Sequence, residues 1–367
     1  MVKISKYKTL LLLLLIIVAG IIIGILLGPY NPIKKEKTIV GFIMYGEKTE
    51  AGWNGVHYKA VEQACRQQGV ELIVKENVEE MTGACEEAIR ELAAEGARMI
   101  ILNSYGYSQE VFDVVVKYPE ISFYGISPEY HADNMTSYFA RMYQARYLSG
   151  IVAGMQTKSD KIGYVAAMAN DEVNRGISAF TLGVRRMNPD AEVIVKWTGS
   201  WDDEEKETEA VNLLIERENV DVITYHQNQD YVVAAAEKEG VPVIGYHHYY
   251  SGYSNKYLTA AVCNWEILYQ TLIREFQQGK GNMKENYWIG MEEEVVGLSA
   301  CTDLVSEEML GEVEKAKKEI LSGKDVFSGI IYDNKGKLQC GEYETISDEM
   351  LLEHFDWYAE GIRFYEE

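Results

Sequence analysis

The sequence predicts an α/β protein with two Rossmann-like lobes, each built around a parallel sheet. Short apolar runs alternate with amphipathic helical segments along most of its 367 residues, and this pattern occurs twice in tandem. Apolar runs that alternate with helices through short loops are typical of parallel sheets covered on both faces. With 47% hydrophobic residues, the chain is long enough to bury two sizeable cores.

The individual elements follow from the two hydrophobic periods. The predicted strands of the first half are 38–45, 71–75, 98–103 and 121–126, and the predicted helices between them span about 51–68, 82–95 and 108–117. In the second half, the strands KIGYVAA, EVIVKW, VDVITYH and VPVIGYH are separated by helices near 172–187, 203–218 and 229–238. A ninth strand at 258–265 precedes a further helix. Small or polar residues follow the strands, and α/β folds place their ligands at this edge of the sheet.

The N-terminal segment determines the expected location of the chain. Residues 10–28 form a run of nineteen residues without a charge, close to the length that spans a bilayer as a helix. The apolar part of a signal peptide is shorter, at roughly 7–15 residues. We therefore expect an uncleaved transmembrane signal-anchor at 10–28, between a cytoplasmic head at 1–9 and a linker at 29–37. The alternative is a cleaved signal peptide of unusual length, and in both cases the remainder lies outside the cytoplasm.

The acidic composition argues against nucleic acid as a partner. The formal charge is −22 and the pI is near 4.8, whereas binding to phosphates requires clustered lysine and arginine side chains. The five cysteines form no C-x-x-C motif, so we expect buried free thiols with at most one or two disulfides.

Catalytic and metal-binding motifs are absent from the sequence. It contains no G-x-S-x-G, P-loop, H-E-x-x-H or G-x-G-x-x-G motif, so we expect neither an enzyme nor a cofactor. Zinc would require three or four converging ligands, and three histidines occur between His226 and His248. His247 and His248 are adjacent, however, and adjacent side chains of a strand point to opposite faces. We therefore expect no metal site.

Three segments resemble a known family. The segments are RYLSGIVAG (146–154), KIGYVAA (161–167) and RGISAFTLGVRRMNP (175–189). Their sequences resemble those of the basic membrane protein family of ABC-transporter substrate-binding proteins. The resemblance implies a type I periplasmic-binding-protein fold, in which the chain crosses three times between two lobes and the ligand lies at the crossings. It implies crossings near 138–141, 263–265 and 295–300, a first lobe of 38–137 plus 265–297, and a second lobe of 138–264 plus 298–367.

The resemblance and the loop chemistry indicate site residues in the first half. Trp53 and Asn54 match the family positions at which an aromatic ring stacks on a base and an amide binds the ligand. The alternative for Trp53 is a hydrophobic staple on the first helix. Ser104 and Tyr105 follow the third strand and match a family serine and aromatic residue; otherwise they are turn residues, with Ser104 capping the next helix.

The second half also has candidate ligand-binding residues at the ends of its predicted strands. Relatives carry a tryptophan at the position of Trp201, whereas Trp197 is expected to be buried in the sheet. Gln227 and Asn228 present paired donors and acceptors that suit the edge of a purine. The predicted ligand-binding residues are Trp53, Asn54, Ser104, Tyr105, Trp201, Gln227, Asn228, His247 and Trp265, with His247 and Trp265 on the hinge side.

One departure from the family favours a free purine base over a nucleoside. Nucleoside-binding relatives carry an aspartate that holds the ribose hydroxyls and a lysine on the hinge strand. This chain has Tyr249 and its neighbours at the first position and Asn264-Trp265 at the hinge. Losing a carboxylate acceptor and an ammonium donor weakens recognition of the ribose more than that of the base.

The sequence therefore predicts a membrane-anchored, extracytoplasmic receptor that captures a purine base or nucleoside and passes it to the permease and ATPase of an ABC importer. Two alternatives stay open. The first is a ligand-sensing subunit for a signalling partner. The second is a sugar receptor of the same fold, because aromatic-rich loops suit a sugar ring nearly as well as a base.

The long apolar run without a cleavage signal generates the first testable prediction. We expect residues 10–28 to be retained and to hold the protein in the membrane fraction. Intact-mass analysis of the mature protein checks this, and a mature N-terminus near Tyr30 would contradict it.

Overall fold

The computed structural model describes residues 38–366, apart from 51, 127, 248–254 and 285. The predicted head, membrane segment and linker lie outside these residues. Within the described part of the chain, no helix is both long and apolar enough to cross a membrane.

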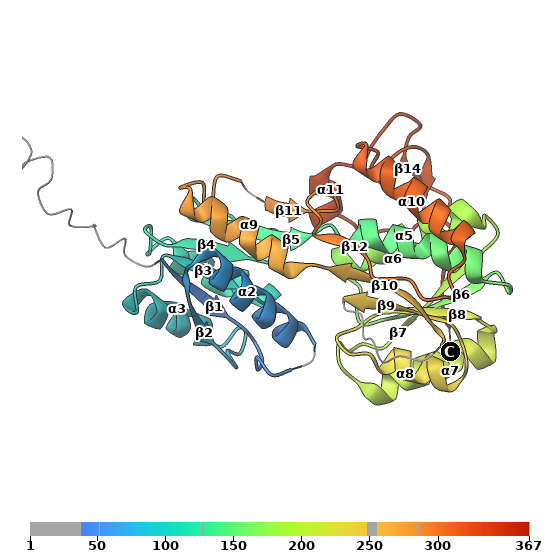
Figure 1. The fold of residues 1–367 in the computed structure, drawn as a ribbon, viewed down its shortest axis with the longest axis horizontal. Helices are drawn as coiled ribbons and strands as arrows, with labels where there is room; N and C mark the ends of the chain where they lie inside the picture. Colours follow the sequence, from blue (N-terminus) through green and yellow to red (C-terminus); the bar gives the residue numbers. More distant parts are fainter. Residues whose placement is uncertain (1–37, 51, 127, 248–254, 285, 367) are drawn as a thin grey trace, which may run out of the picture. The chain divides into compact units, whose positions relative to one another are not determined.

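The first sheet has six strands in the order β11-β5-β4-β3-β1-β2, and all of its pairs are parallel (Figure 1). Apolar residues occupy most strand positions, and β3 is buried throughout. The strands are β1 (Ile39–Ile43), β2 (Glu71–Lys75), β3 (Met99–Leu102), β4 (Ser122–Gly125), β5 (Met135–Ala140) and β11 (Asn286–Ile289).

The second sheet has seven strands in the order β12-β10-β9-β8-β6-β7-β15. Its pairs are parallel except for the antiparallel pair of β10 with β12. The strands are β6 (Lys161–Ala166), β7 (Glu192–Trp197), β8 (Val222–His226), β9 (Val243–His247), β10 (Tyr257–Cys263), β12 (Val296–Leu298) and β15 (Ile362–Phe364). Two largely parallel sheets, with helices between their strands, confirm the predicted α/β class of the described chain.

Helices connect the strands and cover the sheets. In the first half they are α2 (Trp53–Gln68), α3 (Ala84–Ala94) and α4 (Tyr105–Val115). The later helices are α5 (Met142–Gln156), α6 (Asp171–Met187), α7 (Glu204–Glu218), α8 (Tyr231–Lys238), α9 (Trp265–Gln277), α10 (Glu307–Leu321) and α11 (Asp348–Glu353). In Figure 1, α10 and α11 lie beside α5 and α6, together with the hairpin of β13 (Ile331–Tyr332) and β14 (Leu338–Cys340).

The chain passes between the sheets at three places. β5 ends at Ala140 in the first sheet and β6 begins the second, so the first sheet extends past the predicted boundary at 137. The second passage follows β10, where Asn264 accepts a hydrogen bond from the Ile267 N–H at 3.5 Å and starts α9. This cap ends the strand earlier than the predicted residue 265. The third passage lies between β11 and β12.

All five cysteines are free in the structure. Cys65, Cys85 and Cys340 are buried, whereas Cys263 and Cys301 are only half-buried.

Helices α5 and α6 pack together through glycines. A Cβ on Gly183 would collide with the backbone oxygen of Tyr147, and a Cβ on Gly150 would collide with that of Phe180. The backbones approach so closely that no side chain fits between them. Helix α5 directly follows the first passage between the sheets. The contact therefore holds α6, a helix of the second half, close to that passage.

The start of α7 rests on a buried glutamate. Asp203 accepts a hydrogen bond from the Lys206 N–H at 3.1 Å, and Glu207 accepts one from the Asp203 N–H at 3.3 Å, in the manner of a capping box. Glu207 is fully buried, and its Oε2 has no hydrogen-bond partner among the described residues. Burial, supported by the nearby charge of Asp202, raises the pKa of Glu207 to about 8.

The glycine contact predicts that Gly183→Ala destabilises the protein by about 1–3 kcal/mol, because the added methyl group forces α5 and α6 apart. Urea unfolding followed by circular dichroism measures the effect. Gly311→Ala in α10 is the control, since nothing lies near its added Cβ. It should be neutral or stabilising by up to about 1 kcal/mol. Equal effects of the two variants would refute the close-packing argument.

The buried glutamate predicts a pH-dependent stability. Folded protein keeps the proton on Glu207 up to about pH 8, whereas the unfolded chain releases it near 4.5. The stability linked to this proton is therefore fully present below pH 4.5 and declines as the pH rises toward 8. Glu207→Gln cannot ionise, so its stability relative to wild type should increase between about pH 5 and about pH 8.

Unfolding curves at both pH values test this, with exposed Glu209 changed to Gln as the matched control on the same helix. A stability difference between Glu207→Gln and wild type that stays constant with pH would contradict the prediction.

Candidate functional site

A cavity of about 620 Å³ lies among the loops that follow the strands of both sheets. Eight of the nine predicted site residues line it: Trp53, Asn54, Ser104, Tyr105, Trp201, Gln227, Asn228 and His247. We call it the main cavity. The residues that sequence reasoning did not select include Tyr45, Glu80, Ile126, Phe139, Met168, Ala169, Asn170, Glu172, His226 and Tyr246.

Trp53 is held rigidly in the first turn of α2. Its indole Nε1 donates a hydrogen bond to the Asn103 carbonyl at 3.0 Å. Its ring lies parallel to Phe139, with centroids 6.4 Å apart, and meets His247 edge-on at 5.9 Å. Trp53 therefore joins residues of both sheets at the cavity wall.

The ninth predicted residue, Trp265, lies behind this wall. It is only 2% exposed and lines a small adjoining cavity with Trp53, His57 and His247. Its ring centroid is 4.2 Å from that of His57, whose own centroid is 3.9 Å from that of Trp53. Trp265 thus supports Trp53 from behind instead of lining the main cavity.

The two amide side chains are oriented by the protein itself. Asn54 Nδ2 donates to Glu50 at 2.8 Å, and Gln227 Nε2 donates to the Thr198 hydroxyl at 2.9 Å. The remaining oxygens, Asn54 Oδ1 and Gln227 Oε1, have no hydrogen-bond partner among the described residues. Both amides therefore keep an unused acceptor.

The loops of the second sheet are tied to one another. The Asn228 N–H donates to the Trp201 carbonyl at 2.9 Å, which links the loops after β7 and β8. The Trp201 ring meets His226 at a centroid distance of 6.0 Å. Trp197 does not line the main cavity: it is half-buried and stacks on Phe364 at 6.2 Å. His248 and Tyr249 lie outside the described residues.

Ser104 and Tyr105 lie at the start of α4, after the end of β3. Ser104 stands at the N-cap of α4, but its side chain makes no capping hydrogen bond. Instead, Glu80 accepts a hydrogen bond from the Gly106 N–H at 2.7 Å and so occupies the start of this helix. Tyr105, in the same turn, is 58% exposed at the cavity.

The carboxylate of Glu172, which the sequence analysis did not select, lines the part of the main cavity that the second half of the chain forms. Tyr246 donates to Glu172 at 3.1 Å, and His226 Nε2 lies 3.5 Å from the same carboxylate. Burial disfavours the charge on Glu172, but the facing His226 and Arg175 outweigh it and lower the pKa of Glu172 to about 2. Burial lowers the pKa of His226. The sequence signal was local: Asn170 caps α6 by accepting from the Val173 N–H at 2.9 Å, and acidic residues follow it in the first turn.

The charged residues that line the main cavity limit the class of ligand that suits it. Among the described residues that line it are two carboxylates, Glu80 and Glu172, but no lysine or arginine. No group of three histidine, cysteine or acidic side chains suited to a metal occurs in the described segments. The cavity thus offers aromatic faces and hydrogen-bond acceptors, without a cation for a phosphate.

Comparisons with known proteins agree with this architecture. The chain is 31% identical to a purine-binding protein of Brucella abortus over 332 residues, which cover 89% of this chain and 93% of the relative. It is 30% identical to a Haloferax volcanii protein named as a glucose-binding protein of an ABC transporter, covering 90% of this chain and 82% of the relative.

Solved structures share the fold. A transcriptional activator of the comK gene from Bacillus halodurans superposes with a TM-score of 0.69 at 22% identity, covering 78% of this chain and 98% of that chain. A solute-binding protein of an ABC transporter system from Conexibacter woesei gives a TM-score of 0.64 at 21% identity, covering 78% and 97%.

A family model described as PnrA-like ABC transporter substrate-binding protein matches residues 37–330. The chain belongs to this family of ABC-transporter substrate-binding proteins, the basic membrane protein family that its sequence resembles.

Proposed function

We propose that the main cavity binds a purine base or nucleoside, and that the protein delivers this solute to the permease and ATPase of an ABC importer. The observation that carries the proposal is that aromatic rings and two amide side chains, each with a buried oxygen that has no partner among the described residues, line one cavity. Trp53, Phe139 and Trp201 supply the rings, and Asn54 and Gln227 supply the acceptors.

A planar heterocycle matches this chemistry. Its face stacks on an aromatic ring, and its N–H groups satisfy the oxygens of Asn54 and Gln227. Leaving a buried acceptor without a partner is costly, so a ligand that donates to these oxygens gains affinity. The purine-binding relative from Brucella abortus supports the same ligand class.

The charge of the cavity favours an uncharged ligand. With Glu80 and Glu172 in its walls and no cation among its described lining residues, it would repel a phosphate. Free bases and nucleosides fit this condition, whereas nucleotides do not.

The receptor would act outside the cytoplasm, anchored through residues 10–28, and would close around its solute by hinge motion. It requires no cofactor and no catalytic activity, because capture and release are sufficient for a transport receptor.

A sugar is the second candidate. The Haloferax volcanii relative carries a glucose-binding name, and a carboxylate such as Glu172 accepts sugar hydroxyls as readily as N–H groups. Both candidates use the same aromatic walls, so the ligand panel must include both classes.

Trp53→Ala should lower purine affinity by about 1–3 kcal/mol, or roughly tenfold to a hundredfold, because it removes the stacking surface. Calorimetric titration of adenine, guanine, hypoxanthine, their nucleosides and glucose measures this. Trp197→Ala is the control: it removes packing against Phe364, so it should lower stability with little change in affinity.

Unchanged purine affinity in Trp53→Ala would show that another residue stacks on the base. Tight glucose binding without a purine signal would transfer the function to the sugar candidate.

A further inference from the structure

A second, smaller cavity adjoins the main cavity. The two share Tyr105, Ile126, Phe139, Asn170 and Glu172 as lining residues. The smaller one, which we call the side cavity, has a volume of about 70 Å³ and is lined in addition by Pro128, Asp171, Arg175 and Leu352. One water requires about 10–15 Å³, so the side cavity has the room of roughly five to seven waters, enough for a compact substituent such as a pentose but not for a second purine.

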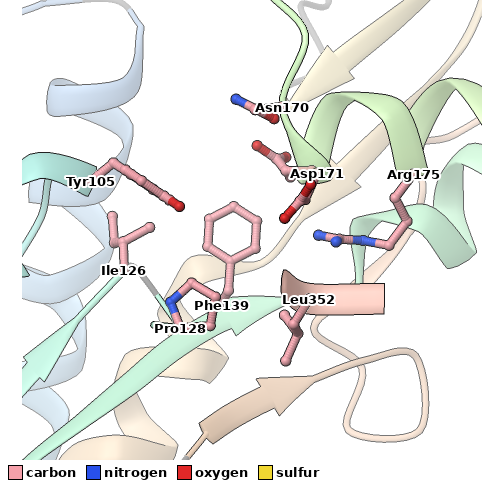
Figure 2. A pocket seen from close by; sticks show the side chains of 9 residues that line it. Tyr105, Ile126, Pro128, Phe139, Asn170, Asp171, Arg175 and Leu352 are labelled. Carbon is pink, nitrogen blue, oxygen red and sulfur yellow. The ribbon is translucent and has the colours of Figure 1, made fainter. Parts of the chain in front are cut away.

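The walls of the side cavity differ in character. Figure 2 shows Tyr105 and Ile126 on one side and Asn170, Asp171 and Arg175 on the other, with Phe139 between them and Leu352 at the lower edge. Carboxylate and amide groups therefore face a wall made largely of carbon. A hydroxylated substituent suits such walls, because its C–H faces are apolar while its hydroxyls donate to carboxylates.

Arg175 does not offer its charge freely to a ligand. It is 4% exposed and donates to the backbone carbonyl of Leu351, and its guanidinium carbon lies 5.1 Å from the centroid of the Trp288 ring. Its role in the side cavity is to hold the chain that carries Leu352.

Leu352 comes from a part of the chain beyond the family match, which ends at residue 330. It belongs to the six-residue helix α11 and is 9% exposed. Four further contacts fasten this segment to the rest of the protein. Asn174 donates to the Phe355 carbonyl at 3.2 Å, Tyr358 donates to Asn174 at 2.8 Å, the Ala359 N–H donates to Ser178 at 3.1 Å, and Arg141 donates to Asp348 at 2.8 Å.

These four contacts join the segment around Leu352 to helix α6 and to Arg141. Asn174 and Ser178 lie on α6, the helix whose first turn carries Asp171 and Glu172. Arg141 lies where the chain leaves the first sheet, and its guanidinium stacks over Trp288 at 4.1 Å. The segment around Leu352 is therefore positioned against both the acidic wall of the side cavity and the passage between the sheets.

We infer that the side cavity is a second compartment of the solute site, and that Leu352 is a specificity-determining residue that limits which hydroxylated substituent of the solute can enter. The inference rests on the proposed function and deepens it. It assigns substrate selection to the C-terminal segment around Leu352, which lies beyond the residues that the family model matches.

The test compares Leu352→Phe, Leu352→Ala and wild type by calorimetric titration. The ligands are paired so that each pair differs by one hydroxylated substituent: adenine with adenosine, hypoxanthine with inosine, and xylose with glucose. Met350→Ala is the control, because Met350 lies on the same helix but is 45% exposed and does not line the side cavity. Thermal unfolding of each variant verifies that it is folded.

Leu352→Phe should lower affinity for the substituted member of the pair by about tenfold relative to the unsubstituted member, the scale on which a pocket discriminates small groups. Leu352→Ala should shift the ratio in the opposite direction, and Met350→Ala should leave it unchanged. If folded Leu352 variants keep the wild-type ratio, the inference is overturned while the proposed function stands. If wild type binds sugars alone, the glucose pair decides the inference and only the purine proposal fails. If wild type binds none of the panel, both fail.

Discussion

The parallel direction of the strands is the constraint on which the site depends. β1, β3, β4 and β5 run the same way in the first sheet, as do β6, β8 and β9 in the second. Every loop at their carboxyl ends therefore emerges at one edge of its sheet. Trp53, Ser104, Trp201 and Gln227 are far apart along the chain, and this geometry brings them around one cavity.

A buried polar cluster fixes the first half of that cavity. Asn103 Oδ1 accepts hydrogen bonds from Tyr138 at 3.0 Å and Tyr269 at 3.2 Å, while its carbonyl holds the indole of Trp53. Tyr269 also lies 2.5 Å from His57 Nδ1. One asparagine at the end of β3 thus ties together β5, α9 and α2. Buried networks of this kind orient side chains, and in this one Asn103 Nδ2 and His57 Nε2 have no hydrogen-bond partner among the described residues.

The second half of the cavity is built on buried charge. Arg146 is 1% exposed, donates to the Tyr225 carbonyl at 2.6 Å, and lies 3.8 Å above the Tyr246 ring. Tyr246 in turn reaches Glu172 and His226. Burying charged groups opposes folding unless they are well paired, so an apolar core would be the simpler solution here. Perturbed ionisable groups beside a cavity are characteristic of functional sites, where polar recognition is retained at the expense of stability.

The sequence by itself determined the elements, the two-sheet class and eight of the residues that line the main cavity. Hydrophobic periodicity is local and located the strands, and the loops after parallel strands lie at the ligand edge of a sheet, so Gln227 and Asn228 were identified without coordinates. Trp53 and Asn54 were identified through their match to family positions. Tertiary structure alone decided the rest. Phe139 and Tyr246 reach the main cavity, and Leu352 the side cavity, from segments whose meeting depends on long-range packing. Long-range packing also decided the position of Trp265, which lies behind Trp53 and not in the main cavity. Its position depends on the packing of α9 against α2, which no local sequence pattern encodes.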